Sequence, residues 1–266
     1  MNPALALLLG AGVAALAWSA RSLSRSGAVA AALVGAGTLH AAGWWGGALL
    51  LTFFVGSSAV SRLAPDPAAE RGEAKGHARD AGQVLANGGA PVMGALLVLG
   101  DPGASLALLA IGLAAAAADT WATSLGATSP TPPRHLFTGR VVVPGTSGGV
   151  TWRGTLGGAF GAMTLAMVAY VSTHDPSLAL GTGPRLAIAA LGLGTAGMLL
   201  DSALGATLQG RFWCERCNTA TERPVHRCGT AATHTMGFAW LTNDGVNALS
   251  TIIVTGLGWW WWSCCR

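Results

Sequence analysis

The chain has 266 residues, of which 52% are hydrophobic and only 10% are charged, with a mean hydropathy of +0.51 and a formal net charge of +4. Soluble domains carry roughly a quarter charged residues, so this composition excludes an ordinary soluble domain and indicates a polytopic membrane protein. The apolar runs are long and continuous, whereas a β-barrel has short alternating segments. We therefore expect an all-α transmembrane bundle that forms a single integral-membrane domain over residues 1–266.

About eight apolar segments have the length of a membrane helix. In chain order they cover approximately residues 2–20, 27–42, 43–60, 83–100, 103–127, 153–172, 183–210 and 241–262. The first has no small-residue cleavage site and is followed by further segments, so we interpret it as a membrane helix rather than a removed signal peptide. The second is short for a span, and we expect it to be tilted or partly re-entrant.

Lysine and arginine are concentrated in every second connection between these segments. Of the 15 basic residues, all but Arg185 and Arg266 follow the first, third, fifth or seventh segment. The positive-inside rule places these connections in the cytoplasm and both chain termini outside. We therefore expect a multi-pass protein of the cytoplasmic membrane, with long cytoplasmic loops at 61–82, 128–152 and 211–240. The positive charge then reflects topology and indicates no nucleic-acid partner.

A basic and polar cluster leads into the fourth segment. Lys75 and Arg79 precede it, and Arg79, Gln83 and Asn87 recur every four residues as one helical stripe. Lysine offers a point charge to phosphate and arginine a bidentate fork, so we interpret the cluster, with Asp80, as a phosphate site. An ordinary basic loop would explain the two cations, but not the polar residues that continue into an apolar segment.

Three aspartates lie at similar depths in segments that are otherwise almost free of charge, namely Asp119, Asp201 and Asp244. Asp119 and Asp201 lie about seven and about nine residues before the cytoplasmic ends of their segments, which is on the order of 10–14 Å inside the rim. Carboxylates in hydrocarbon are costly and are rarely kept without a task. Because Mg²⁺ prefers a few carboxylates together with substrate phosphates, we predict a magnesium site. Capping or bonding to a neighbouring hydroxyl is the alternative for any single aspartate.

Two asparagines accompany the last aspartate. Asn243 and Asn247 are four residues apart, and Asp244 and Asn247 three apart, so they share one helical face. Helix capping would explain Asn243 or Asp244, but not Asn247 inside the segment.

A run of small residues stands just before the sixth segment. It comprises Gly145, Thr146, Ser147, Gly148 and Gly149. Its backbone N–H groups and the following helix N-terminus are suited to an anion. It is not a Walker motif, and a plain flexible loop explains it equally well.

The loop at 211–240 contains a group of potential metal ligands. Cys214 and Cys217 form a C-x-x-C pair, and His226, Cys228 and His234 follow. Three cysteines and one histidine form a tetrahedral zinc set, and a reducing cytoplasm argues against a disulfide. We therefore expect a small structural zinc insertion built from the three cysteines with either His226 or His234. Packed thiols without metal remain the alternative, because no second C-x-x-C pair completes the pattern.

Taken together, these motifs resemble an integral-membrane family, long catalogued as a domain of unknown function, that includes plant phytyl-phosphate kinase. The resemblance is carried by residues 79–88, 118–126, 145–149, 228–230 and 243–247. It implies transfer of a phosphoryl group from a nucleoside triphosphate, CTP or ATP, to an isoprenoid monophosphate, which gives the diphosphate.

On this interpretation the site residues take separate roles. Asp119, Asp201 and Asp244 hold Mg²⁺, while Lys75 and Arg79 hold phosphates. The residues that orient metal-bound water or substrate oxygens are Asn87, Ser124, Asn243 and Asn247. The partners are a lipid monophosphate, the nucleotide and the bilayer.

Two other functions use the same residues. A lipid-phosphate nucleotidyltransferase would need the same magnesium and basic groups, and an ion-coupled transporter would also keep buried carboxylates. A transporter usually has polar residues across the whole membrane, whereas the polar clusters here lie towards the inner half, which favours an enzyme. Other loop arginines, Arg62 among them, are expected to serve topology alone.

Overall fold

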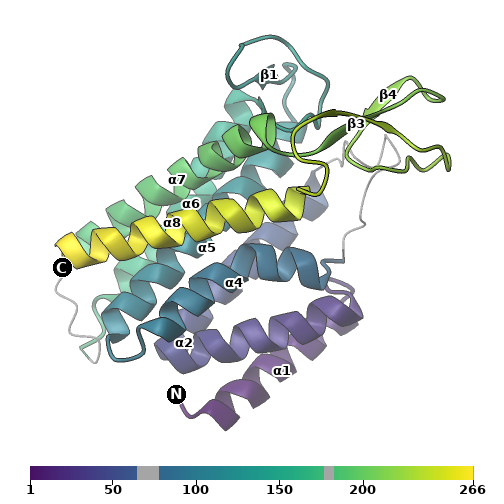
Figure 1. Ribbon diagram of the computed structural model, residues 1–266. Coiled ribbons are helices and arrows are strands. Elements are labelled where there is room, and N and C mark those ends of the chain that lie inside the picture. Colours follow the sequence, from purple (N-terminus) through teal and green to yellow (C-terminus); the bar gives the residue numbers. More distant parts are fainter. Residues whose placement is uncertain (65–77, 177–182, 266) are drawn as a thin grey trace.

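The computed structural model describes residues 1–64, 78–176 and 183–265 and shows a bundle of long helices with short strands at one end (Figure 1). The helices are α1 (Pro3–Ser19), α2 (Arg25–Leu63), α4 (Ala81–Leu97), α5 (Pro102–Ala127), α6 (Trp152–Ser172), α7 (Gly183–Thr207) and α8 (Asn243–Cys265). Among the described residues α2, α5, α6 and α7 have the length and hydropathy of a membrane span. The helical membrane bundle is confirmed, while the count of eight spans and the outside position of the termini stay predictions.

Helix α2 is a hairpin rather than one long rod. Gly43 leaves the helical conformation with φ 58° and ψ −145°, a backbone region that favours glycine. Near the end of α2, Arg62 donates a hydrogen bond of 2.6 Å to Ser22 Oγ, just before α2 begins. Both ends of α2 therefore lie together, and the chain reverses where the second and third apolar segments meet.

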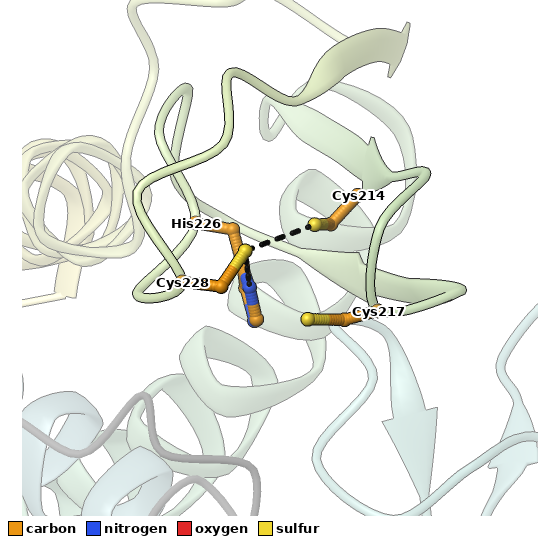
Figure 2. Close-up of side chains that lie close together, drawn as sticks. All are labelled: Cys214, Cys217, His226 and Cys228. Carbon is orange, nitrogen blue, oxygen red and sulfur yellow. Dashed lines mark hydrogen bonds between the residues drawn. The ribbon is translucent and has the colours of Figure 1, made fainter.

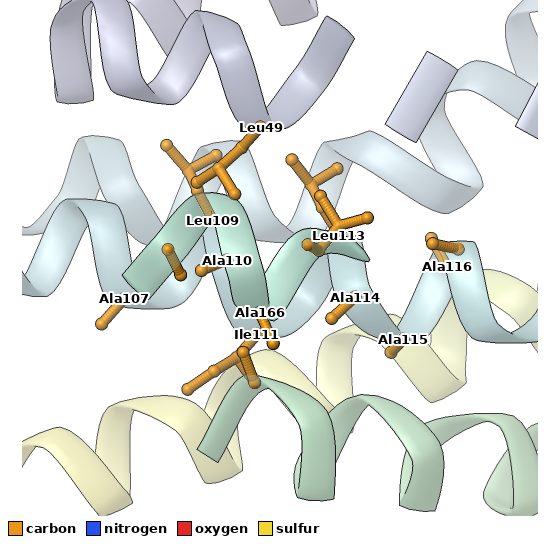
Figure 3. Close-up of a cluster of buried hydrophobic side chains, with 14 of the residues drawn as sticks. Leu49, Ala107, Leu109, Ala110, Ile111, Leu113, Ala114, Ala115, Ala116 and Ala166 are labelled. Carbon is orange, nitrogen blue, oxygen red and sulfur yellow. The ribbon is translucent and has the colours of Figure 1, made fainter. Parts of the chain in front are cut away.

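Helix α5 occupies the centre of the bundle. Every residue from Gly103 to Ala118 is buried, and Figure 3 shows its alanines and leucines among side chains of neighbouring helices. A helix that is apolar on all sides belongs in the interior. Small residues also let α6 approach closely, because a Cβ at Gly154 or Gly158 would lie 2.7 or 2.8 Å from an α5 carbonyl oxygen.

Two small antiparallel sheets, which the all-α expectation omitted, lie at one end of the bundle. One pairs β1 (Arg134–His135) with β2 (Gly149–Val150). The other has the order β4-β3-β5, with β3 Arg211–Cys214, β4 Thr219–Thr221 and β5 Thr233–Met236. Both chain ends lie at the opposite end of the bundle (Figure 1). The long polar connections between α5 and α6 and between α7 and α8 thus lie at one end of the bundle, as predicted for these two. Most of the third predicted loop, at 61–82, lies outside the described residues.

Cysteine labelling tests which end of the bundle faces the cytoplasm. Thr138 is exposed in the connection between α5 and α6, whereas Cys264 and Cys265 are exposed at the far end of α8. In intact cells an impermeant maleimide should modify Cys264 or Cys265, but should modify a Thr138→Cys variant only after permeabilisation. The reverse result would contradict the topology inferred from the basic residues.

Candidate active site

A cavity of about 920 Å³ lies at the end of the bundle that carries the strands. Its walls come from the C-terminal ends of α2, α5 and α7, from the N-terminal ends of α4, α6 and α8, and from the connection between α5 and α6. The predicted site residues that line it are Arg79, Gln83, Asn87, Asp119, Ser124, Gly145, Thr146, Ser147, Gly148, Asp201, Asn243, Asp244 and Asn247. Lys75 lies outside the described residues, and Asp80 does not line the cavity.

The start of α4 positions the basic stripe. Asp80 is the N-cap of this helix: its Oδ1 accepts a hydrogen bond from Gln83 N at 3.0 Å, and Gln83 Oε1 accepts one from Asp80 N at 3.1 Å. This capping box satisfies two of the free N–H groups of the first turn. The backbone of Arg79 is bonded on both sides to the link between α1 and α2, through Ser22 O and Ser24 N at 3.0 Å each. Asp80 therefore positions Arg79 and Gln83 at the cavity wall.

The guanidinium of Arg79 is held in an unusual environment for a cation. It lies 5.6 Å from the ring centroid of Phe53 and 5.9 Å from that of Phe54. Burial lowers the pKa of Arg79, and no carboxylate in the described part of the chain offsets this shift. A buried arginine that faces aromatic rings and a cavity is suited to an anionic ligand.

Asp119 of α5 and Asp201 of α7 also line the cavity, and Asp201 contacts side chains of α8. Asp201 is only 9% exposed, and its Oδ2 accepts a hydrogen bond from Ser250 Oγ at 3.0 Å. With its amide nitrogen turned toward Asp201, an orientation assigned from the surrounding partners, Asn247 donates to the same oxygen at 3.0 Å. Asp119 lies close enough to act electrostatically on Asp201. Two neighbouring carboxylates repel each other, and a bound cation removes that repulsion.

The third aspartate links two helix starts. A Cβ added at Gly82 would lie 3.3 Å from Asp244 Oδ2 and also 3.3 Å from Asp80 Oδ1. The first turn of α8 is thus packed against the first turn of α4. This contact brings the carboxylate of Asp244 to the same cavity as the basic stripe.

The small-residue run is a tight turn rather than a plain flexible loop. Gly148 has φ +79°, and a Cβ there would lie 2.4 Å from the Cβ of Ala206 on α7. Gly149 N donates to Thr146 O at 2.9 Å. Only glycine combines this backbone conformation with such a close approach. The turn leads through β2 to Thr151, the N-cap of α6, and so presents the loop and a helix N-terminus to the cavity.

Arg62 was expected to be a surface-loop arginine, but it is an exposed residue in the last turn of α2. It lines the cavity and donates hydrogen bonds to Ser22 Oγ at 2.6 Å and to Ala20 O at 3.4 Å. Ser58 and Ser61 precede it in the cavity wall at helical spacing. That polar stripe at the end of an apolar segment was the signal in the sequence that indicated a site residue.

Gln209 is a second site residue that the sequence interpretation missed. It is 1% exposed and lines the cavity, and neither polar atom of its side chain has a hydrogen-bond partner among the described residues. Buried polar groups are normally satisfied, so a free amide at a cavity wall is suited to bonding a ligand. A single glutamine after an apolar segment gives no recognisable signal. Glu222 and Arg223 also line the cavity from beyond β4.

The cysteine-rich loop brings four ligand side chains together (Figure 2). The ligand atoms of Cys214, Cys217, His226 and Cys228 all lie within 4.8 Å of one another. His234 lies elsewhere, with its ring 5.3 Å from that of Phe212. The structure therefore selects His226 from the two histidines considered.

The thiols of this group differ in acidity. A hydrogen bond from the Thr230 side chain, together with one from His226, lowers the pKa of Cys228 to about 5. The hydrogen bond between Cys217 and Cys228 raises the pKa of Cys217 to about 11. These hydrogen bonds favour the thiolate form of Cys228, the form that binds metals.

Comparison with known proteins identifies relatives along most of the chain. The model of the family described as "Integral membrane protein DUF92" matches residues 8–255. "Protein PGR" of Arabidopsis thaliana is 30% identical over 277 residues, covering 95% of this chain and 93% of the relative. An uncharacterized membrane protein of Methanocaldococcus jannaschii is 33% identical over 193 residues, covering 71% of this chain and 76% of the relative. No solved structure matches the chain.

Proposed function

This chain belongs to the integral membrane protein family DUF92, and from that premise we propose that it is a magnesium-dependent isoprenyl-monophosphate kinase. It is a multi-pass membrane protein, and the proposed site faces the cytoplasm. The observation that carries the proposal is that the carboxylates of Asp119 and Asp201 and the partly buried guanidinium of Arg79 line one and the same cavity. Phosphoryl transfer depends on positioning and on neutralising charge, and these groups supply both.

Two walls of the cavity are suited to phosphate. Arg62 and Arg79 both contact Ser22. The side chain of Arg62 donates a hydrogen bond to Ser22 Oγ, and the backbone N–H of Arg79 donates one to Ser22 O. The Gly145–Gly149 turn forms the other wall, where Ser147 Oγ donates to Glu222 at 2.8 Å. The carboxylates of α5 and α7 line the same cavity. On this proposal one wall holds the phosphate of the lipid and the other holds the phosphates of the nucleotide.

The surroundings of the two walls favour one arrangement of the substrates. Arg79 lies over Phe53 and Phe54 of α2, whose hairpin continues into the apolar part of the bundle. A prenyl chain in the bilayer therefore places its phosphate at the arginine wall. The glycine turn belongs to the polar connection between α5 and α6, and it receives the nucleotide from the aqueous side.

The reaction needs no dedicated base. An oxygen of the lipid monophosphate is already anionic, and it attacks the γ-phosphorus of the nucleotide. The new P–O bond forms as the bond from the γ-phosphorus to its bridging oxygen breaks, and the nucleoside diphosphate leaves. The oxygen donors of Asp119, Asp201 and Asp244 fit Mg²⁺, which when bound neutralises charge on the transferring group. Arg62 and Arg79 hold the acceptor phosphate in line.

Product analysis tests this proposal directly. The purified full chain, incubated with geranylgeranyl monophosphate, Mg²⁺ and either ATP or CTP, should release a nucleoside diphosphate and form the lipid diphosphate in equal amounts. Release of pyrophosphate with a nucleotide attached to the lipid would identify a nucleotidyltransferase instead. If neither nucleotide is consumed with prenyl monophosphates of several chain lengths, the proposed activity is wrong.

The position of the polar groups disfavours a transporter. Those that line the cavity lie at the end of the bundle that carries the strands, and every residue of α5 from Gly103 to Ala118 is buried. A transport pathway would need polar groups on the other side of the membrane midplane as well. Movement of prenyl phosphates across vesicles without nucleotide consumption would contradict this argument.

A further inference from the structure

Residues 211–236 form a small unit outside the helical bundle, which we name the cap. Its sheet, β4-β3-β5, projects beyond the helices in Figure 1. Two backbone hydrogen bonds close its base, from Phe238 N to Leu208 O at 2.8 Å and from Gly210 N to Leu241 O at 3.0 Å. The chain thus leaves the end of α7, forms the cap and returns beside its starting point before α8 begins.

The cap has almost no hydrophobic core. Its buried residues are Phe212, Cys214, Thr221 and His226, and two of these four belong to the Cys/His group. Units below about 40 residues usually need a disulfide, a metal or a partner to stay folded. The ordered strands of the cap therefore require a source of stability other than apolar burial.

Two tight loops of the cap present the ligand atoms. Cys214 and Cys217 stand at the turn between β3 and β4, and the chain reverses at Asn218 with φ 49°. His226 and Cys228 stand on the second loop, where Gly229 reverses the chain with φ 79°. Each loop thus offers two ligands and then turns back through a left-handed residue. Figure 2 shows the four side chains converging from the two loops.

The distances agree with a tetrahedral metal site. Zn–S bonds of about 2.3 Å in a tetrahedron place two sulfur atoms about 3.8 Å apart. Cys214 Sγ and Cys228 Sγ are 3.7 Å apart, and His226 Nδ1 lies 3.2 Å from Cys228 Sγ. Packed thiols explain the group poorly, because Cys217 is exposed and gains no burial. Thiolate and imidazole ligands in this geometry select zinc among the common metals.

We propose that the cap binds one zinc ion through Cys214, Cys217, His226 and Cys228, and that this ion holds the cap against the cavity. Glu222 and Arg223 lie between the two ligand loops in the sequence, and both line the cavity. Glu222 accepts the hydrogen bond from Ser147 of the glycine turn.

Arg211 fixes the same junction from β3. It donates hydrogen bonds to Ser147 O and, at 3.2 Å, to Gly205 O. A zinc ion that joins the ligand loops on both sides of Glu222 and Arg223 therefore sets the position of one cavity wall. The proposed zinc site does not depend on the proposed kinase activity. Only an effect of zinc on the rate of turnover would rest on that activity.

Metal analysis is the first test. The full chain, purified in detergent without added metal, should contain about one zinc per molecule. Cys217→Ser removes an exposed ligand without touching the core, so this variant should lose most of its zinc. The matched control, Cys264→Ser with Cys265→Ser at the far end of α8, should retain it. Cobalt substitution should give thiolate-to-metal absorption bands in the wild type and the control, but not in Cys217→Ser.

Absence of zinc from the wild type would overturn the proposal. So would equal zinc in Cys217→Ser, or a disulfide between Cys214 and Cys228 detected by mass analysis in place of the metal.

Limited proteolysis provides a readout that is independent of activity. Arg216 and Arg227 are trypsin sites within the cap, whereas Arg223 precedes Pro224 and is not cleaved. Removing zinc with a chelator should speed cleavage there at least about tenfold, because metal binding and folding are coupled in such units, while the helical bundle stays intact. Unchanged cleavage would show that zinc does not hold the cap. Zinc binding and protection without kinase activity would leave this inference standing and refute only the proposed function.

Discussion

The Asp119→Asn and Asp201→Asn variants should each lose at least about 100-fold in kcat/KM, because groups that merely support metal ligands already cost roughly 10- to 100-fold when removed. Asparagine keeps the shape of aspartate but removes the charge that attracts Mg²⁺. The bundle should remain folded, because Ser250 and Asn247 still have an oxygen to contact at position 201. Activity measured across a range of Mg²⁺ concentrations checks the result.

Stability without Mg²⁺ separates a metal ligand from a structural aspartate. Asp119 and Asp201 repel each other, so neutralising either one should leave the Tm of the metal-free protein unchanged or higher. The control is Asp175→Asn at the other end of the bundle, where the amide oxygen still accepts the 2.8 Å hydrogen bond from Trp45. It should keep full activity. Near wild-type turnover of Asp119→Asn at low Mg²⁺ would refute the assignment.

The Arg79→Lys variant should lose about 10- to 100-fold in kcat/KM for the lipid monophosphate. Lysine keeps the positive charge but cannot form the bidentate contact, and a hydrogen bond to a charged group contributes roughly 1.5–3 kcal/mol. Steady-state kinetics with the lipid varied at saturating nucleotide measures the loss.

The control for Arg79→Lys must be an arginine that does not line the cavity. Arg62 lines the cavity and is therefore unsuitable as a control. Arg140 is exposed in the same polar connection as the glycine turn and does not line the cavity. Arg140→Lys should therefore leave the kinetics unchanged, whereas Arg62→Lys should weaken lipid binding because it loses the contact with Ser22. Equal and small effects at positions 79 and 140 would place the phosphate site elsewhere.

Much of the candidate site could be predicted because helical spacing and depth are local properties of the sequence. Gln83 and Asn87 line one wall because they share a face of α4, whereas Arg79 lies before the N-cap and reaches the same wall from outside the helix, so the predicted helical stripe was wrong for Arg79. Asp119 and Asp201 line one cavity because their segments end at the same side. The capping role of Asp80 was also present in the sequence, as the spacing from Asp80 to Gln83 typical of a capping box.

Other parts of the site depend on contacts that are remote in the chain. Arg62 reaches the cavity only because α2 reverses at Gly43 and returns to the link that contains Ser22. Gln209 is buried only because the cap closes over the end of α7. The short strands carry little apolar periodicity, so a search for long hydrophobic segments does not detect them.

The reversal at Gly43 bears on how the protein enters the membrane during its synthesis. A single residue separates the halves of α2, and the tip, Ala41-Ala42-Gly43-Trp44-Trp45, carries no charge. A longer loop with charged side chains would have to carry those charges through the hydrocarbon layer during insertion. At Gly43 little more than one turn of uncharged backbone has to pass through it. We therefore expect the two halves to insert together as a preformed pair, with the tryptophans anchoring the tip at the membrane surface.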